Sequence, residues 1–324
     1  MSTSGSLEIK LFDPLLHDVD LPLRGTYYPL GFRLNLVTNS REVLQAATES
    51  WGCFEPEFER EPVEIRIVVR PEGALVQEQP VFRGQGHLFS IFYDCDNFGV
   101  YDSRAMCGFA FVSERTAAKH IRLRVHFLEA MAYMLLAQRY GAPVHGACVA
   151  REESGVLLCG VSGAGKSTLA FCCARRGWTY VSDDAAWLVR DAEDRMALGK
   201  PHQIRFREDA PRLFPELEAY AARTRPNGKL SIEVPLADFP HIRTAPRCAI
   251  DRMVILDRRA GTAARLDSIP AEEVIDALMQ DGPSYGEEVN AWHEETIRRL
   301  LGARAYRLRY DALDEAVETL EITR

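Results

Sequence analysis

The sequence has no apolar run of about 18 residues, the length that a membrane-spanning helix needs. Acidic residues outnumber basic ones by 47 to 39, which gives a formal net charge of −8. That balance argues against a general nucleic-acid-binding role, because such proteins carry an excess of basic residues. The opening residues, Met-Ser-Thr-Ser-Gly-Ser, lack the basic and apolar regions of a signal peptide. We therefore expect a cytoplasmic protein that acts on neither nucleic acid nor membranes.

Cysteine is present, but the spacing of a metal site is missing. None of the eight cysteines forms a C-x-x-C pair, and no His-x-x-x-His accompanies them. Structural zinc sites in sequences usually show such spacings. Several cysteines stand in apolar segments, where a reduced thiol is a common core residue. We expect reduced core cysteines and no structural zinc.

The first third of the chain has the pattern of β-strands. Leu7–Phe12, Phe32–Val37 and Val63–Val68 alternate apolar and polar side chains. Such alternation is typical of half-buried strands, and we expect an antiparallel sheet. We therefore predict a smaller β-rich N-terminal domain over 1–114. A regulatory or substrate-selecting role and a purely structural one are equally compatible with it.

From residue 115 onward, predicted helices alternate with predicted strands. Leu128, Met131 and Leu135 recur at helical spacing, so we expect one long helix over Glu114–Tyr140. Apolar segments typical of buried strands follow at Val144–Ala150, Gly155–Cys159 and Trp178–Val181. Further helices are expected at Ala210–Arg223, Ala271–Gln280, Glu287–Leu301 and Leu313–Glu321. This order indicates an α/β domain over 115–324.

One glycine-rich segment carries the clearest chemistry. Gly160-Val-Ser-Gly-Ala-Gly-Lys166-Ser167-Thr168 fits the phosphate-loop pattern G-x-x-x-x-G-K-[ST], between a predicted strand and a predicted helix. Glycines let the backbone curl around a polyphosphate, and amides at the helix start point at the anion. Lys166 would neutralise the β/γ charge, and the Ser167 hydroxyl would bind Mg²⁺. We assign ATP, or another nucleoside triphosphate, to Gly160, Ser162, Gly163, Ala164, Gly165, Lys166, Ser167 and Thr168.

Two adjacent acidic residues, Asp183 and Asp184, follow the predicted strand Trp178–Val181. A parallel strand beside the loop strand would bring both carboxylates next to the phosphates. One could hold Mg²⁺ while the other accepts a proton from an attacking hydroxyl. A strand-to-loop turn capped by aspartate is the structural alternative. Asp257, at the end of the apolar segment Met253–Leu256, is a rival magnesium ligand.

Four further residues are candidates for the same site. His145, 21 residues before Lys166, stands in a segment that a strand pair would bring toward the loop. A nearby carboxylate would tune its charge near neutral pH, although a lone histidine is more often a core residue. Lys229, Arg205 and Arg207 are candidate phosphate contacts, because positive charge around the γ-phosphate favours transfer. Solvated surface charge is the alternative for these three.

Together these segments resemble the catalytic domain of the HPr kinase/phosphorylase family. The resemblance covers residues 145–187. It is carried by Val144-His145-Gly146-Ala-Cys-Val149, Gly160–Ser167 and Tyr180-Val-Ser-Asp183-Asp184, in that order. It implies a P-loop kinase domain with a mixed sheet and flanking helices. It also implies that Asp183 is the general base, or the acid in the reverse reaction, with His145 coupled to it. Asp184 would lie near the metal that Ser167 binds.

The chain also departs from this family. The run E-[IV]-R-G-L-G is missing, and Asn227-Gly-Lys229-Leu-Ser-Ile-Glu233 is a poor substitute. Thr168 stands where the family has glutamate, and the N-terminal half does not resemble the family's usual N-terminal domain. These differences argue against HPr as the acceptor. The same loop and aspartates occur in relatives that modify peptides, including kinases of lasso-peptide precursors.

The leading hypothesis is an ATP- and Mg²⁺-dependent kinase that phosphorylates a hydroxyl, Ser or Thr in a peptide or protein. A small-molecule kinase on the same scaffold and a nucleotide-binding sensor or assembly module without transfer are the alternatives. The sequence leaves open whether the protein forms a homo-oligomer. The phosphate loop itself carries no information on the acceptor.

Overall fold

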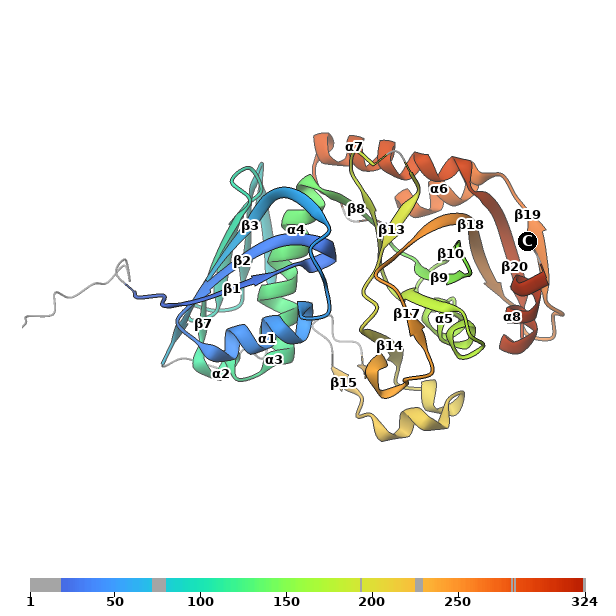
Figure 1. Cartoon of the computed structure of the whole chain (residues 1–324), viewed down its shortest axis with the longest axis horizontal. Coiled ribbons are helices and arrows are strands. Elements are labelled where there is room, and N and C mark those ends of the chain that lie inside the picture. Colours follow the sequence, from blue (N-terminus) through green and yellow to red (C-terminus); the bar gives the residue numbers. More distant parts are fainter. Residues whose placement is uncertain are drawn as a thin grey trace, which may run out of the picture.

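The computed structural model describes residues 19–71, 80–192, 194–224, 230–280, 282 and 284–322. The expected strand at Leu7–Phe12 and the candidate Lys229 lie outside the described residues. Two sheet-based halves lie next to each other, with the N-terminal half in blue and teal and the C-terminal half in green to red (Figure 1). The chain is a mixed α/β protein whose sheets carry helices.

The N-terminal half is built on a seven-stranded sheet with the order β1-β2-β3-β7-β6-β5-β4. Its strands are β1 (Leu23–Tyr27), β2 (Phe32–Thr38), β3 (Phe58–Arg70), β4 (Val81–Gln85), β5 (Leu88–Phe92), β6 (Phe98–Asp102) and β7 (Cys107–Ser113). The expectation of an antiparallel sheet was wrong in part, because β3 runs parallel to both β2 and β7. Helix α1 (Arg41–Trp51) carries the chain back between β2 and β3. Alternation of apolar and polar side chains indicates that a strand is half-buried, but it does not indicate whether neighbouring strands run parallel or antiparallel.

The helix expected over Glu114–Tyr140 is interrupted. It consists of α2 (Glu114–Ala117), α3 (His120–Leu123), a π-helical turn at Arg124–Leu128 and α4 (Glu129–Arg139). Lys119, between α2 and α3, has the non-helical angles φ −101° and ψ 75°. Apolar spacing predicted the buried face correctly but gave no sign of this break.

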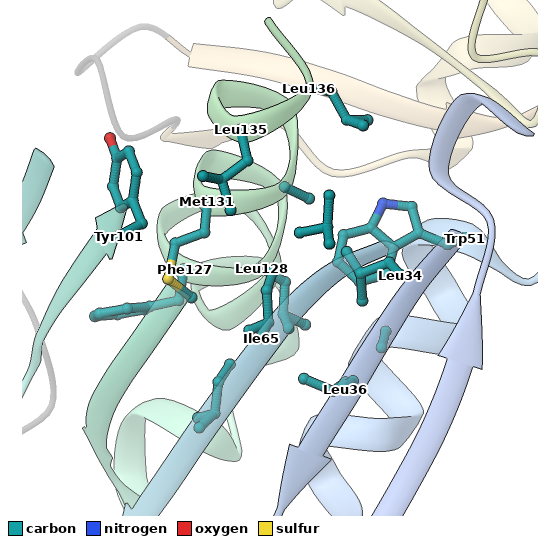
Figure 2. Close-up of a cluster of buried hydrophobic side chains, with 14 of the residues drawn as sticks. Leu34, Leu36, Trp51, Ile65, Tyr101, Phe127, Leu128, Met131, Leu135 and Leu136 are labelled. Carbon is teal, nitrogen blue, oxygen red and sulfur yellow. The ribbon is translucent and has the colours of Figure 1, made fainter. Parts of the chain in front are cut away.

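The apolar face of this segment covers the N-terminal sheet. Figure 2 shows Phe127, Leu128 and Met131 against Leu34 and Ile65, all of them buried. The boundary at 114/115 stays a prediction. The helices that follow it belong to the same hydrophobic core as the strands that precede it.

The C-terminal half is built on a larger mixed sheet with the order β17-β11-β9-β10-β18-β13-β12-β8, and β20 and β19 extend it from β18. Its strands are β8 (Gly141–Val144), β9 (Ala147–Arg151), β10 (Ser154–Cys159), β11 (Thr179–Ser182), β12 (Ala186–Val189), β13 (Met196–Leu198), β17 (Arg243–Thr244), β18 (Arg247–Arg258), β19 (Arg265–Ser268) and β20 (Arg304–Tyr310). Strands β10, β18 and β20 are parallel neighbours, whereas β9 is antiparallel to β10. A mixed sheet with flanking helices is therefore present.

Helices cover this sheet in two layers. Helices α5 (Lys166–Arg175) and α8 (Leu313–Ile322) share one core with Val156 and Leu158 of β10. Helices α6 (Ala271–Gln280) and α7 (Glu287–Arg298) share another core with Leu157 and Cys159. Because alternate residues of a strand point to opposite faces, this apolar strand is buried from both sides.

A small third sheet, β14-β16-β15, stands beside α5. Its strands are β14 (Gln203–Arg207), β15 (Arg223–Thr224) and β16 (Leu230–Pro235). The helix expected over Ala210–Arg223 was wrong, since two 3₁₀ turns occupy Ala210–Arg212 and Pro215–Ala219. Pro215, in the interior of the expected helix, lacks the amide hydrogen that a continuous α-helix requires.

Truncation of Leu128 tests this packing. Its side chain is buried between the sheet and the helices, so Leu128→Ala should lower the free energy of unfolding by about 2–5 kcal/mol. Urea denaturation measures the loss. Leu301→Ala is the matched control. Because Leu301 is 38% exposed, this variant should change the free energy of unfolding by less than about 0.5 kcal/mol. Equal losses in the two variants would contradict the packing described.

Candidate active site

Strand, glycine-rich loop and helix follow one another as the motif requires. Strand β10 ends at Cys159, and α5 begins at Lys166. Gly163 and Gly165 have φ of +92° and +96°, a region that other residues rarely adopt. A Cβ atom at Gly163 would stand 2.7 Å from an Arg207 guanidinium nitrogen, and one at Gly165 would stand 2.9 Å from the Tyr310 hydroxyl. The backbone conformation therefore favours glycine at both positions, and at Gly165 the hydroxyl of the buried Tyr310 also leaves no room for a Cβ atom.

The Lys166 ammonium binds the backbone of its own loop. Its side chain is largely buried, and Nζ donates to the carbonyl oxygens of Gly160 at 2.6 Å and Val161 at 3.4 Å. The next residue, Ser167, directs its hydroxyl toward the Asp183 carbonyl oxygen at 3.5 Å. The ammonium thus lies at the first residues of the loop, and the serine lies toward the aspartate pair.

The expected strand order around the aspartates was wrong, although the predicted convergence is present. Strand β11, which precedes Asp183, does not neighbour β10, because β9 lies between them and pairs with both. Strand β9 is antiparallel to each, so β10 and β11 run in the same direction. Their carboxyl ends consequently meet at one edge of the sheet. Asp183 reaches the loop from there.

Asp183 and Asp184 have different surroundings. Asp183 is 7% exposed, and its Oδ2 accepts a hydrogen bond from the Arg205 backbone N–H at 2.7 Å. The Asp184 side chain is 53% exposed, and its Oδ1 lies 3.5 Å from Nε2 of His145. One carboxylate is therefore buried and fixed by a backbone amide, while the other faces a histidine near solvent.

These groups line one open cavity of about 480 Å³, a volume typical of small-molecule sites. The predicted residues in its wall are His145, Ser162, Gly163, Gly165, Lys166, Ser167, Thr168, Asp183, Asp184, Arg205 and Arg207. Gly160 lines an adjoining cavity, and the Ala164 carbonyl accepts from the Tyr310 hydroxyl at 3.3 Å. Segments far apart in the sequence, from His145 to Tyr310, thus converge on the loop.

The two candidate arginines lie differently in this wall. The guanidinium of Arg205 pairs with Glu233 at 3.0 Å, and its backbone N–H donates to Asp183. The Arg207 guanidinium lies over Gly163 at the tip of the loop. The wall also contains Arg258, which was not among the residues predicted from the sequence. Its position just after Asp257, at the end of the strand beside the loop strand, was the available signal.

Asp257 ends the strand that neighbours β10, yet its carboxylate is directed away from the loop cavity. It pairs with Arg259 at 2.8 Å and with Arg309 at 3.5 Å. The hydrogen bond from Arg259 is the largest of the effects that hold the pKa of Asp257 below its usual value. Asp257 lines the adjoining cavity instead.

Among the described residues, no cluster of three or more His, Cys, Asp or Glu side chains could hold a metal ion. Magnesium at nucleotide sites takes most of its oxygen ligands from phosphates and water, with only one or two from carboxylates. The Ser167 hydroxyl and the carboxylates of Asp183 and Asp184 supply oxygen donors of that kind in one cavity wall. The residues present therefore fit a Mg²⁺ ion that arrives with a nucleotide.

A buried charge network connects Asp183 to the N-terminal half. Arg205 pairs with Glu233, whose other oxygen lies 3.7 Å from Arg124. Arg124 in turn lies 3.6 Å from Glu129. Glu129 accepts from the Ser50 hydroxyl of α1 at 2.9 Å and lies 3.8 Å from Lys200. Arg124 also lies 3.5 Å from Glu49, so the cations Arg124, Lys200 and Arg205 are surrounded by several carboxylates.

The network sets the charge state of its buried members. Burial alone would raise the pKa of Glu129, but Lys200, Arg205 and Arg124 outweigh burial and lower it to about 2. Burial lowers the pKa of Lys200 to about 8, although Glu129 opposes the change. Isolated buried charges are costly, so these groups depend on one another.

No family model matches the chain, and no curated protein matches it in sequence. Among solved structures it is similar to the HPr(Ser) kinase/phosphatase from Coxiella burnetii, with a TM-score of 0.29 and 12% sequence identity over 56% of this chain and 88% of that one. A TM-score this low does not identify a fold. The HPr kinase type of the C-terminal domain therefore stays a prediction.

No helix in the part of the chain that the structure describes combines the length and apolarity needed to cross a membrane.

Replacement of Glu129 tests the charge network. Because the folded-state pKa of Glu129 is depressed, its stabilisation is present above the usual value of 4.5 and is lost as pH falls toward about 2. Glu129→Gln should lower the free energy of unfolding at neutral pH by on the order of 3 kcal/mol, with a smaller difference at acidic pH. Urea denaturation over a pH series measures both. The control Glu294→Gln removes an exposed pair with Arg298 and should change little.

Proposed function

We propose that this protein is an ATP-dependent kinase that transfers the γ-phosphoryl group to a hydroxyl of a peptide or protein. The observation that carries the proposal is the buried Asp183 carboxylate in the same cavity wall as Lys166. A phosphate loop alone implies nucleotide binding. A fixed carboxylate beside it supplies the proton acceptor that transfer to a hydroxyl requires.

The loop would hold the triphosphate. Glycines at 163 and 165 keep its backbone close enough to wrap phosphate oxygens, and the start of α5 adds a favourable dipole. Lys166 would exchange its present carbonyl partners for the β- and γ-phosphates. Arg207, over the tip of the loop, supplies further positive charge. Lys229, outside the described residues, stays a predicted contact.

An apolar part of the cavity suits the nucleoside. Phe206, Leu213 and Leu230 line it, and Leu213 and Leu230 are 46% and 44% exposed. An exposed apolar wall next to a polar phosphate site matches the two ends of a nucleotide. ATP is therefore the expected donor, with another nucleoside triphosphate as the alternative.

Asp183 would act as the general base. The Arg205 N–H fixes one of its oxygens, so the carboxylate keeps one orientation toward the loop. His145 and Asp184 form a second polar pair at the cavity mouth and would steady the charge changes around it. Magnesium, when bound through Ser167 and a carboxylate, would neutralise charge on the phosphates.

A peptide or protein acceptor agrees with the resemblance to HPr kinases, which covers residues 145–187. A small-molecule kinase predicts that only small hydroxyl compounds accept label from ATP. A sensor or assembly module predicts tight ATP binding without any phosphorylated acceptor. The buried carboxylate favours transfer over binding alone, because a mere binder needs no proton acceptor. Self-association stays a prediction.

Lys166→Ala should abolish measurable ATP binding, because it removes the cation at the β- and γ-phosphates. Isothermal titration calorimetry with Mg-ATP tests this. The control Arg298→Ala removes an exposed cation on α7 and should leave binding unchanged. Undiminished affinity in Lys166→Ala would contradict the loop assignment.

Asp183→Asn should bind ATP normally yet lose phosphoryl transfer by about 100-fold or more, since general-base catalysis contributes about that much. Labelled ATP with Ser- and Thr-containing peptides measures transfer. Asp314→Asn is the matched control, because that carboxylate on α8 is 84% exposed. Full transfer by Asp183→Asn would exclude Asp183 as the base.

A further inference from the structure

A second cavity of about 450 Å³ adjoins the loop cavity. His145 lines both cavities, and the second one opens at the first loop residues, Gly160 and Val161. Its remaining lining comes from the ends of β10 and β18, from α6 and from β20. Nothing in the binding of a nucleotide to the loop explains this second space.

The position of Lys166 shows which end of a bound triphosphate would face this cavity. Lysine in this motif reaches the β- and γ-phosphates. Here Nζ lies against the carbonyl oxygens of Gly160 and Val161, the two loop residues that line the second cavity. The apolar wall suited to the base belongs to the first cavity. The γ-phosphate would therefore lie between the two spaces.

One side of the second cavity is aliphatic. Ile255, Leu256, Ala277 and Leu278 form it, and Val161, which also lines the cavity, is 77% exposed. His145 and Gln280 line the cavity as well, together with charged groups that are paired, Arg259 with Asp257 and Arg307 with Glu273. Because the aliphatic side offers no hydrogen-bond partner, a group that packs against it is favoured when it is an aliphatic side chain.

We propose that this second cavity is the acceptor site, and that it binds an aliphatic side chain of a peptide next to the Ser or Thr that is phosphorylated. The inference rests on the proposed kinase function and adds the substrate class to it. The acceptor oxygen would form a bond to the γ-phosphorus while the bond from that phosphorus to the β–γ bridging oxygen breaks. ADP leaves with the electron pair, and Asp183 takes the hydroxyl proton.

A positional-scanning library of Ser- and Thr-centred peptides, phosphorylated with γ-labelled ATP, tests the proposal. Wild type should prefer Leu, Ile or Val at one position near the acceptor by roughly 10-fold or more over Asp or Lys, as aliphatic pockets do. Phosphorylation without an aliphatic preference would overturn the acceptor site.

Ala277→Asp probes the cavity directly, because Ala277 is an exposed residue of α6. The variant should raise the KM for the best aliphatic peptide about 10-fold and leave the KM for ATP unchanged, since the new charge opposes only the apolar side chain. Ala291→Asp is the matched control, an exposed alanine in the middle of α7 that does not line the cavity. An unchanged peptide KM in Ala277→Asp would also overturn the site.

Two further outcomes separate this inference from the kinase proposal. If small hydroxyl compounds accept label and no peptide does, the kinase stands and the aliphatic peptide site falls. If wild type binds no ATP by calorimetry, the kinase proposal fails first, and the acceptor site with it. Leu278→Asn, checked for folding by urea denaturation, gives a second readout of the aliphatic preference.

Discussion

The hydrogen bond from the Arg205 backbone N–H to Oδ2 of Asp183 is the constraint on which the site depends. A buried carboxylate is costly unless opposite charge and hydrogen bonds compensate for lost water. Strand β14 supplies the amide, and the side chain of the same arginine begins the charge network through Glu233. The group proposed to take a proton is thus held by the element that also connects it to the rest of the protein.

The buried charge network couples the N-terminal half to the candidate site. Arg124 and Glu129 lie on the helical segment that covers the N-terminal sheet, and Ser50 comes from α1 within that half. The ion pairs extend from this segment to Arg205, whose backbone N–H holds Asp183. Loss of any member would leave a buried charge uncompensated, so the packing of one half affects the electrostatics of the other.

The sequence predicted the local site better than its surroundings. The glycine pattern, Lys166 and the aspartate pair predicted a loop and its acidic neighbours, because short motifs carry their own geometry. Sequence did not reveal that β9 separates β10 from β11, since strand order depends on long-range pairing. Apolar spacing also did not reveal the break at Lys119 or the effect of proline within residues 210–223, because both depend on backbone angles. The charges of Arg124 and Glu129 converge through contacts between distant segments, which apolar periodicity does not encode either.

A kinase of the proposed kind must hold a triphosphate on the loop with its γ-phosphate facing Asp183. An experimental structure with Mg²⁺ and a non-hydrolysable ATP analogue would show whether this protein does so. We expect a triphosphate along residues 160–168, with Lys166 at the β- and γ-phosphates and the Asp183 carboxylate facing the γ-phosphorus across the space where an acceptor hydroxyl would lie. A nucleotide bound elsewhere, or a γ-phosphate directed away from Asp183, would contradict it.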